Sequence, residues 1–135
     1  MKIKKYLFLL IKSKCLYFKF KKAIKKAKSG NSQMLHFDMV TGRCIGKTYN
    51  LLKLSGECNI PVIEPFSGSD IYYEKEVKKF NPVIFSRNEM LSSFRRSKYG
   101  RPGSLVLVDE FQMLDDRARK FIVDNYNYVA VETSR

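Results

Sequence analysis

Short apolar runs alternate with segments of helical periodicity along most of the chain. Five of these runs predict β-strands, at residues 34–40, 60–63, 83–85, 105–108 and 128–131. Helices are expected at residues 46–54, 88–96 and 115–124, with Ser55-Gly56 ending the first, and residues 71–80 are expected to be helical or irregular. This alternation is typical of an α/β domain. We therefore expect a three-layer fold with a mainly parallel sheet over residues 31–135.

The first 30 residues follow a different pattern. Lysines there are mixed with apolar residues at spacings loosely compatible with a helix, namely Leu7, Leu10, Ile11, Leu16, Phe18, Phe20 and Ile24. Residues 29–32 have the composition of a linker. The sequence therefore predicts a basic helical N-terminal arm, residues 1–30, ahead of the domain.

The net charge of +13 is concentrated in this arm. Residues 1–30 contain eleven lysines and no acidic residue, whereas residues 31–135 carry fifteen Lys and Arg against thirteen Asp and Glu. Three interpretations of the arm stay open. It is a solvated helix that lays its apolar stripe on the domain, a contact with nucleic-acid phosphates, or, less favoured, a contact with an anionic membrane surface.

Neither secretion nor a membrane-spanning anchor is expected. The apolar run Tyr6–Ile11 is too short for either, lysines interrupt the sequence after it, and no small-residue cleavage site follows. Cys15, Cys44 and Cys58 lack C-x-x-C spacing, which fits a reducing compartment. The expected location is the cytoplasm, or the host cytoplasm if the protein is viral.

The strongest chemical signal lies between the first strand and first helix of the domain. It consists of Thr41, Gly42, Arg43, Cys44, Ile45, Gly46, Lys47 and Thr48. The usual phosphate-binding pattern is G-x-x-x-x-G-K-[ST], in which the lysine reaches the β- and γ-phosphates and the hydroxyl ligates Mg²⁺. Thr41 replaces the first glycine, although Gly42 beside it can supply a positive φ angle. The pattern predicts that this loop binds the phosphates of ATP.

A second signal follows Lys47 by 62 residues, where the apolar run Leu105–Val108 ends in Asp109 and Glu110. Acids at the carboxyl end of a buried parallel strand lie where ligands of such sheets bind. Asp109 is expected to hold Mg²⁺ together with Thr48, and Glu110 to act as general base.

Further polar residues are candidates for contact with the nucleotide. Thr133 and Ser134 follow the last predicted strand. The chain resembles the branch of P-loop proteins with a catalytic glutamate, and this resemblance implies that a polar residue at that position senses the γ-phosphate. Arg43 would neutralise transition-state charge in cis. Weaker candidates for that role are Arg87, Arg95, Arg96 and Arg101.

The paired motifs resemble the branch of P-loop NTPases that has a catalytic glutamate and an extra strand between the two motif strands. Residues 83–85 are expected to be that strand. Residues 42–49 and Glu132-Thr133-Ser134 are similar to viral DNA-packaging ATPases. Residues 108–112 are similar to superfamily 1 helicases, which implies that Gln112 couples the site to nucleic acid. Both resemblances imply a minimal or truncated motor that needs partners.

In its compact spacing the chain resembles thymidine kinase. The matching segments are Asp70-Ile71-Tyr72-Tyr73, Phe85-Ser86-Arg87 and Asp109-Glu110-Phe111-Gln112-Met113. The resemblance implies that Glu110 takes the proton from a nucleoside 5′-hydroxyl. The sequence contains no C-x-x-C for that family's zinc-binding module.

Three functions therefore stay open. They are a Mg²⁺-dependent ATPase acting on nucleic acid, a thymidine-kinase-like phosphotransferase and a non-catalytic nucleotide-binding module. The lysine-rich arm favours nucleic acid as partner. A homo-oligomer, or a partner that supplies an arginine in trans, is compatible with each.

Overall fold

The computed structural model describes residues 2–38, 46–65, 78–92, 101 and 103–134. Its helices are α1 (Lys2–Lys28), α3 (Lys47–Cys58), α5 (Arg87–Ser92) and α6 (Asp116–Asn125), with short 3₁₀ helices η1 (Lys78–Phe80) and η4 (Phe111–Met113). The strands are β1 (Gln33–Asp38), β2 (Val62–Glu64), β3 (Ile84–Ser86), β4 (Leu105–Val108) and β5 (Asn127–Ser134).

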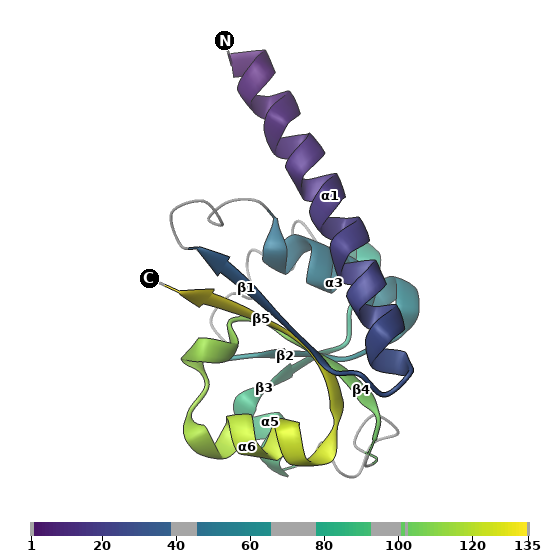
Figure 1. Cartoon of the computed structure of the whole chain (residues 1–135), viewed down its shortest axis with the longest axis vertical. Coiled ribbons are helices and arrows are strands. Elements are labelled where there is room, and N and C mark those ends of the chain that lie inside the picture. Colours follow the sequence, from purple (N-terminus) through teal and green to yellow (C-terminus); the bar gives the residue numbers. More distant parts are fainter. Residues whose placement is uncertain (1, 39–45, 66–77, 93–100, 102, 135) are drawn as a thin grey trace.

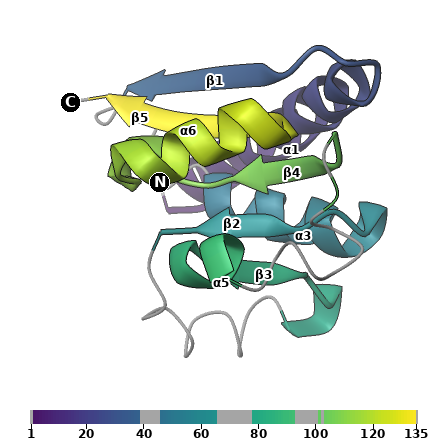
Figure 2. The ribbon, with the colours of Figure 1, turned by 90° about the horizontal axis from the view of Figure 1, so that it is seen from below.

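The five strands form one sheet in the order β1-β5-β4-β2-β3, seen from top to bottom in Figure 2. Every neighbouring pair is parallel, which confirms the expected α/β class. The register places Phe37 beside Thr133, Ile63 beside Val108, and Val108 beside Ala130. The carboxyl ends of β1, β5, β4 and β2 therefore meet along one edge of the sheet, where ligands of parallel sheets bind.

Helices cover both faces of the sheet. Helices α1 and α3 pack on one face, and α5, η4 and α6 pack on the other (Figure 2). Successive residues of the central strands enter opposite clusters: Leu107 belongs to the first, whereas Val106 and Val108 belong to the second. Because both faces are buried, these strands are continuous apolar runs instead of alternating ones.

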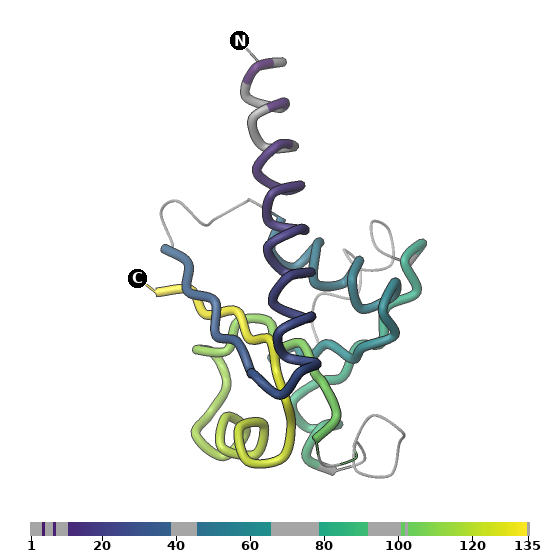
Figure 3. The backbone as a smooth tube through the Cα atoms, turned by 45° about the vertical axis from the view of Figure 1, so that its right-hand side comes forward, coloured from purple at the N-terminus to yellow at the C-terminus, as the bar shows by residue number. Residues whose placement is uncertain are grey.

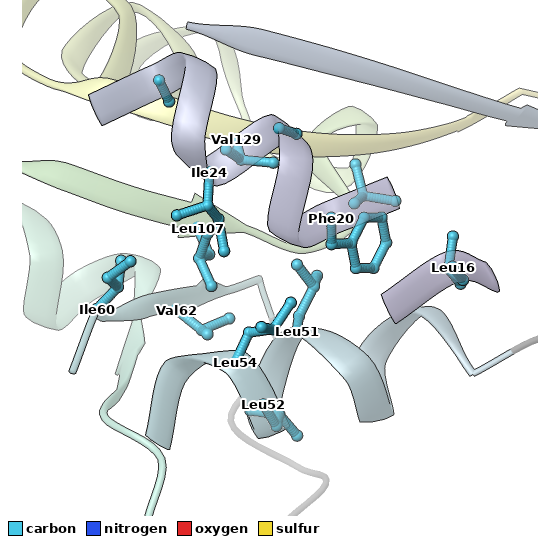
Figure 4. Close-up of a cluster of buried hydrophobic side chains, with 13 residues drawn as sticks. Leu16, Phe20, Ile24, Leu51, Leu52, Leu54, Ile60, Val62, Leu107 and Val129 are labelled. Atoms are coloured by element: carbon cyan, nitrogen blue, oxygen red, sulfur yellow. The ribbon is translucent and has the colours of Figure 1, made fainter. Parts of the chain in front are cut away.

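Helix α1 enters the core over its second half and extends beyond the domain over its first half (Figures 1 and 3). Its buried side chains are Leu16, Phe20, Ala23, Ile24 and Ala27. Figure 4 shows Phe20 and Ile24 directed toward Leu51 of α3 and Leu107 of β4. The expectation that the apolar stripe of the arm lies on the domain is confirmed for this half.

A hydrogen bond also joins α1 to α3. The hydroxyl of Tyr17 donates to Glu57 Oε2 over 2.5 Å. This bond to a carboxylate, together with burial, raises the pKa of Tyr17 to about 12. The second half of α1 therefore belongs to the same packed layer as α3.

The end of α3 differs from the prediction. The helix continues through Ser55 and Gly56, and Asn59 closes it in the left-handed conformation with φ 57°. The packing leaves room only for a glycine at position 56, because a Cβ there would lie 1.7 Å from the carbonyl oxygen of Phe80. Ser55 turns its hydroxyl inward, where it donates to the carbonyl oxygen of Ile60 over 2.5 Å. Neither residue therefore acts as a helix terminator here.

The strand between the two motif strands was also predicted wrongly. The strand expected at residues 83–85 is observed as β3, and it lies at the edge of the sheet beside β2. Strand β5 instead separates β1 from β4. Strand β5 is longer than the predicted 128–131, so Thr133 and Ser134 lie within it.

Within the described residues, no helix combines the length and apolarity needed to cross a membrane.

Candidate functional site

The described residues of the predicted motifs meet at the carboxyl edge of the sheet. Lys47 and Thr48 begin α3, Asp109 directly follows β4, and Thr133 lies near the end of β5. Two hydrogen bonds between side chains connect these three segments of the chain.

The first bond holds the ammonium group of Lys47, which donates to Thr133 Oγ1 over 2.7 Å. The same nitrogen lies 5.4 Å from the ring centroid of Phe37 on β1, a cation–π contact. Phe37 and Thr133 face each other in the register of β1 and β5. The ends of two adjacent strands therefore position the lysine amino group over the sheet edge.

The second bond runs from Thr48 Oγ1 to Asp109 Oδ2 over 2.6 Å. Asp109 is 1% exposed, and its other oxygen, Oδ1, is buried without a hydrogen-bond partner among the described residues. A hydroxyl and a carboxylate side by side are oxygen ligands of the kind that Mg²⁺ prefers. The structure therefore brings together the two residues that were predicted as metal ligands.

A second buried carboxyl group, Glu64, lies beside Asp109. Glu64 ends β2, the neighbour of β4, and is 4% exposed. The Glu64 carboxyl acts on the pKa of Asp109, so the two groups are close neighbours. Because carboxylates only accept, a direct hydrogen bond between them would need a proton on one of them, and a bound cation is the alternative way to stabilise the pair.

Sequence reasoning missed Glu64, although a signal was present. Glu64 directly follows the apolar run 60–63, just as Asp109 directly follows 105–108. The same pattern, an acid directly after a buried strand, therefore marks both Asp109 and Glu64.

The electrostatics of Asp109 are set mainly by its burial, which raises the pKa of its carboxyl, and the charge of Glu110 acts in the same direction. The hydrogen bond from Thr48, the Glu64 carboxyl and the charge of Lys47 lower that pKa, but the net direction is upward. Holding a negative charge on Asp109 is therefore unfavourable within the protein alone, and a cation at the site would relieve this.

Glu110 belongs to a hydrogen-bonded chain that leads back to Lys47. Its backbone is left-handed, with φ 48° and ψ 54°, which is uncommon for a residue other than glycine. Gln112 Nε2 donates to Glu110 Oε2, and Gln112 Oε1 accepts from the N–H of Thr133 over 2.9 Å. Thr133 in turn holds Lys47. Glu110 and Lys47 are thus connected through Gln112 and the end of β5.

The start of α3 is tied to α1, which nothing in the sequence indicated. Gly46 has φ 82°, and a Cβ there would lie 2.9 Å from Ser13 Oγ. Asn50, 2% exposed, places its amide nitrogen 2.9 Å from the Gly46 carbonyl oxygen and 3.0 Å from that of Ser13. Gly46, the N-cap residue, has no side chain that could bond to the first N–H groups of this helix.

Several predicted residues lie outside the described part of the chain: Thr41, Gly42, Arg43, Cys44, Ile45, Arg95 and Arg96. Asp70-Ile71-Tyr72-Tyr73 of the thymidine kinase resemblance also lies outside it.

Two arginines and one serine are described but do not join the site. Arg87 forms a bidentate pair with Asp115, with distances of 3.0 and 2.8 Å. Arg101 precedes β4, so it lies toward the amino edge of the sheet, opposite the site. Ser134 is exposed, and its hydroxyl donates to the carbonyl oxygen of Phe37 over 3.5 Å. We therefore remove Arg101 from the candidates and regard Arg87 as engaged elsewhere.

Comparisons of the chain with protein-family models, with curated proteins and with solved structures find no match. Within the described ranges, no group of three or more His, Cys, Asp or Glu side chains is placed to hold a metal ion.

Proposed function

We propose that the chain binds ATP with Mg²⁺ and hydrolyses it, as a P-loop NTPase of the branch with a catalytic glutamate. The observation that carries the proposal is the convergence of three separately predicted segments through the bonds Lys47–Thr133 and Thr48–Asp109. A lysine and a hydroxyl at a helix start, facing a buried carboxylate, suit a triphosphate with its metal ion.

The donor set fits Mg²⁺ because Asp109 Oδ1 is buried without a hydrogen-bond partner among the residues described. Thr48 and Asp109 would hold the ion, and the Glu64 carboxyl would add negative charge beside them. When bound, Mg²⁺ would supply positive charge that offsets the charge of the phosphates. Its binding would also offset the cost of burying two adjacent carboxyl groups.

Lys47 and Thr133 would contact the γ-phosphate. Lys47 would exchange its hydrogen bond to Thr133 for one to a phosphate oxygen, and the Thr133 hydroxyl would then donate to the same phosphate. The N–H groups at the start of α3 would add further donors. Together they would orient the phosphate chain and stabilise its charge.

Glu110 would act as the general base. It takes a proton from a water molecule whose oxygen forms a bond to the γ-phosphorus, while the bond from that phosphorus to the β–γ bridging oxygen breaks and ADP leaves. Gln112 holds both Glu110 and the backbone of Thr133, so a shift at the phosphate contact would reach the base.

The sheet order supports this branch of P-loop proteins. Strand β5 lies between β1, which leads into the predicted loop, and β4, which ends at Asp109. An extra strand in that place is the feature that the resemblance implies, and here it is the strand that carries Thr133.

An ATP turnover assay tests the proposal, with Mg²⁺ present or replaced by a chelator, for the unmodified chain, Lys47→Ala, Glu110→Gln and, as a matched control, the exposed Lys120→Ala. We expect Mg²⁺-dependent ADP formation. Lys47→Ala should lose binding and turnover, whereas Glu110→Gln should keep binding and lose about a hundredfold or more in rate. Lys120→Ala should behave like the unmodified chain.

The same assay separates the other functions. Stimulation by single- or double-stranded DNA indicates an ATPase acting on nucleic acid, whereas thymidine monophosphate formed from added thymidine indicates a kinase. ATP binding without turnover under every condition would refute hydrolysis.

A further inference from the structure

Helix α1 carries a second apolar stripe, on the face turned away from the domain. Leu7, Ile11 and Phe18 are 50%, 60% and 64% exposed. Their spacings of four and seven residues place them within roughly 40° of one another around a helix. The buried Leu16 and Phe20 lie on the opposite side. The described side chains of α1 thus place apolar residues on two faces, of which the domain covers one.

Lysines flank the exposed stripe. Those closest to it around the helix, all exposed, are Lys4, Lys14, Lys21, Lys22 and Lys25. The helix holds all eleven lysines of residues 1–30 and no acidic residue. Its first half also stands clear of the rest of the domain (Figures 1 and 3). An extended surface would therefore meet the stripe and the lysines together.

We infer that this face of α1 binds the surface of an anionic lipid bilayer, with the helix lying along the interface. In that position Leu7, Ile11 and Phe18 enter the boundary between head groups and acyl chains, while the lysines contact the anionic head groups. The lysine content of α1 suits binding along the surface and not insertion across the bilayer.

Two other occupants fit the same face less well. A second copy of the chain would bring the lysines that flank the stripe against the same lysines of its partner, and this repulsion opposes pairing. Nucleic-acid phosphates would satisfy the lysines, but would leave the large apolar side chains between them without an apolar partner. A bilayer surface is the partner that satisfies both.

The inference is independent of nucleotide binding. If both hold, the contact of Asn50 with Ser13 places the ATP site close to the membrane surface.

The test is cosedimentation of the full chain with phosphatidylcholine vesicles that contain or lack phosphatidylserine. We expect binding to the anionic vesicles only, weakened by salt. The triple variant Leu7→Gln, Ile11→Gln, Phe18→Gln should lose at least about tenfold in affinity, because its apolar contribution is removed. The matched control is Val123→Gln, at a 51% exposed apolar residue on α6, and should bind unchanged.

Because the substituted residues are exposed, the variants should keep the fold, and circular dichroism checks this. The single variant Ile11→Glu, which puts a negative charge in the stripe, should also bind the anionic vesicles more weakly. Equal vesicle binding by the triple variant would overturn the proposal. So would binding to DNA but not to vesicles, or self-association that the triple variant abolishes without any vesicle binding. The triple variant should still bind ATP, because its substitutions lie outside the nucleotide site. Loss of vesicle binding can therefore be told apart from loss of the nucleotide site.

Discussion

Replacement of Asp109 by asparagine should make the protein more stable and impair its proposed site. Asp109 is 1% exposed, burial raises the pKa of its carboxyl, and the Glu64 carboxyl lies beside it. Asparagine keeps the shape and removes the charge. Its amide oxygen can still accept from Thr48, and its NH₂ group can donate to Glu64. A residue retained for function at the expense of stability should respond in this way.

The magnitude follows from two opposing effects. Relieving a buried polar atom that lacks a hydrogen bond contributes about 1–3 kcal/mol to the free energy of unfolding. Replacing the charge-assisted bond from Thr48 by a neutral one costs about 0.5–1.5 kcal/mol. We therefore expect a net gain of about 1 kcal/mol, which corresponds to a rise of about 3–5 °C in Tm for a chain of this size.

Urea unfolding without nucleotide, followed by ATP titration with and without Mg²⁺, checks both halves of this prediction. Asp109→Asn should gain stability and lose the enhancement of ATP binding by Mg²⁺. The exposed Asp124→Asn should change neither. A less stable Asp109→Asn variant that still binds ATP in a Mg²⁺-dependent manner would refute the reasoning, because Asp109 would then be a structural residue.

Three further predictions concern the stability of the fold. Gly46→Ala should destabilise the fold by about 1–3 kcal/mol, because φ is 82° and the new Cβ would lie 2.9 Å from Ser13 Oγ; an unchanged urea midpoint would contradict this. Phe20→Ala, at a fully buried position, should cost about 3–5 kcal/mol in the same assay, whereas a cost below about 1 kcal/mol would mean that α1 is not part of the core. The hydrogen bond from Arg87 lowers the pKa of Asp115 below its ordinary 3.8, so this pair stabilises the folded state above that pH and stops doing so as the pH falls through the lowered pKa. The Tm difference between the unmodified chain and Asp115→Asn should therefore be present at neutral pH and disappear in acid, and a difference that persists in acid would exclude the ion pair as its cause.

The class of the fold was predictable because apolar runs mark strands buried on both faces. Residues 105–108 are observed as β4 with the predicted bounds. The order of the strands was not predictable, since it depends on contacts between distant segments. The edge position of β3 and the central position of β5 are examples. The end of α3 was missed because Gly56 was interpreted as a terminator, whereas the close approach of Phe80 requires a glycine there.

The candidate site was predictable where a residue belongs to a local motif. Lys47, Thr48 and Asp109 come from two such motifs, and the structure brings them to one edge. Contacts that depend on tertiary packing were not predictable from spacing. They include the cation–π contact of Lys47 with Phe37 and the link from Asn50 to α1.

Isothermal titration of ATP into the full chain, with and without Mg²⁺, tests the central claim most directly. The unmodified chain and Lys120→Ala should bind ATP more tightly with Mg²⁺, and Lys47→Ala should not bind detectably. Absence of binding by the unmodified chain, or undiminished binding by Lys47→Ala, would contradict the assignment of this site to a nucleoside triphosphate.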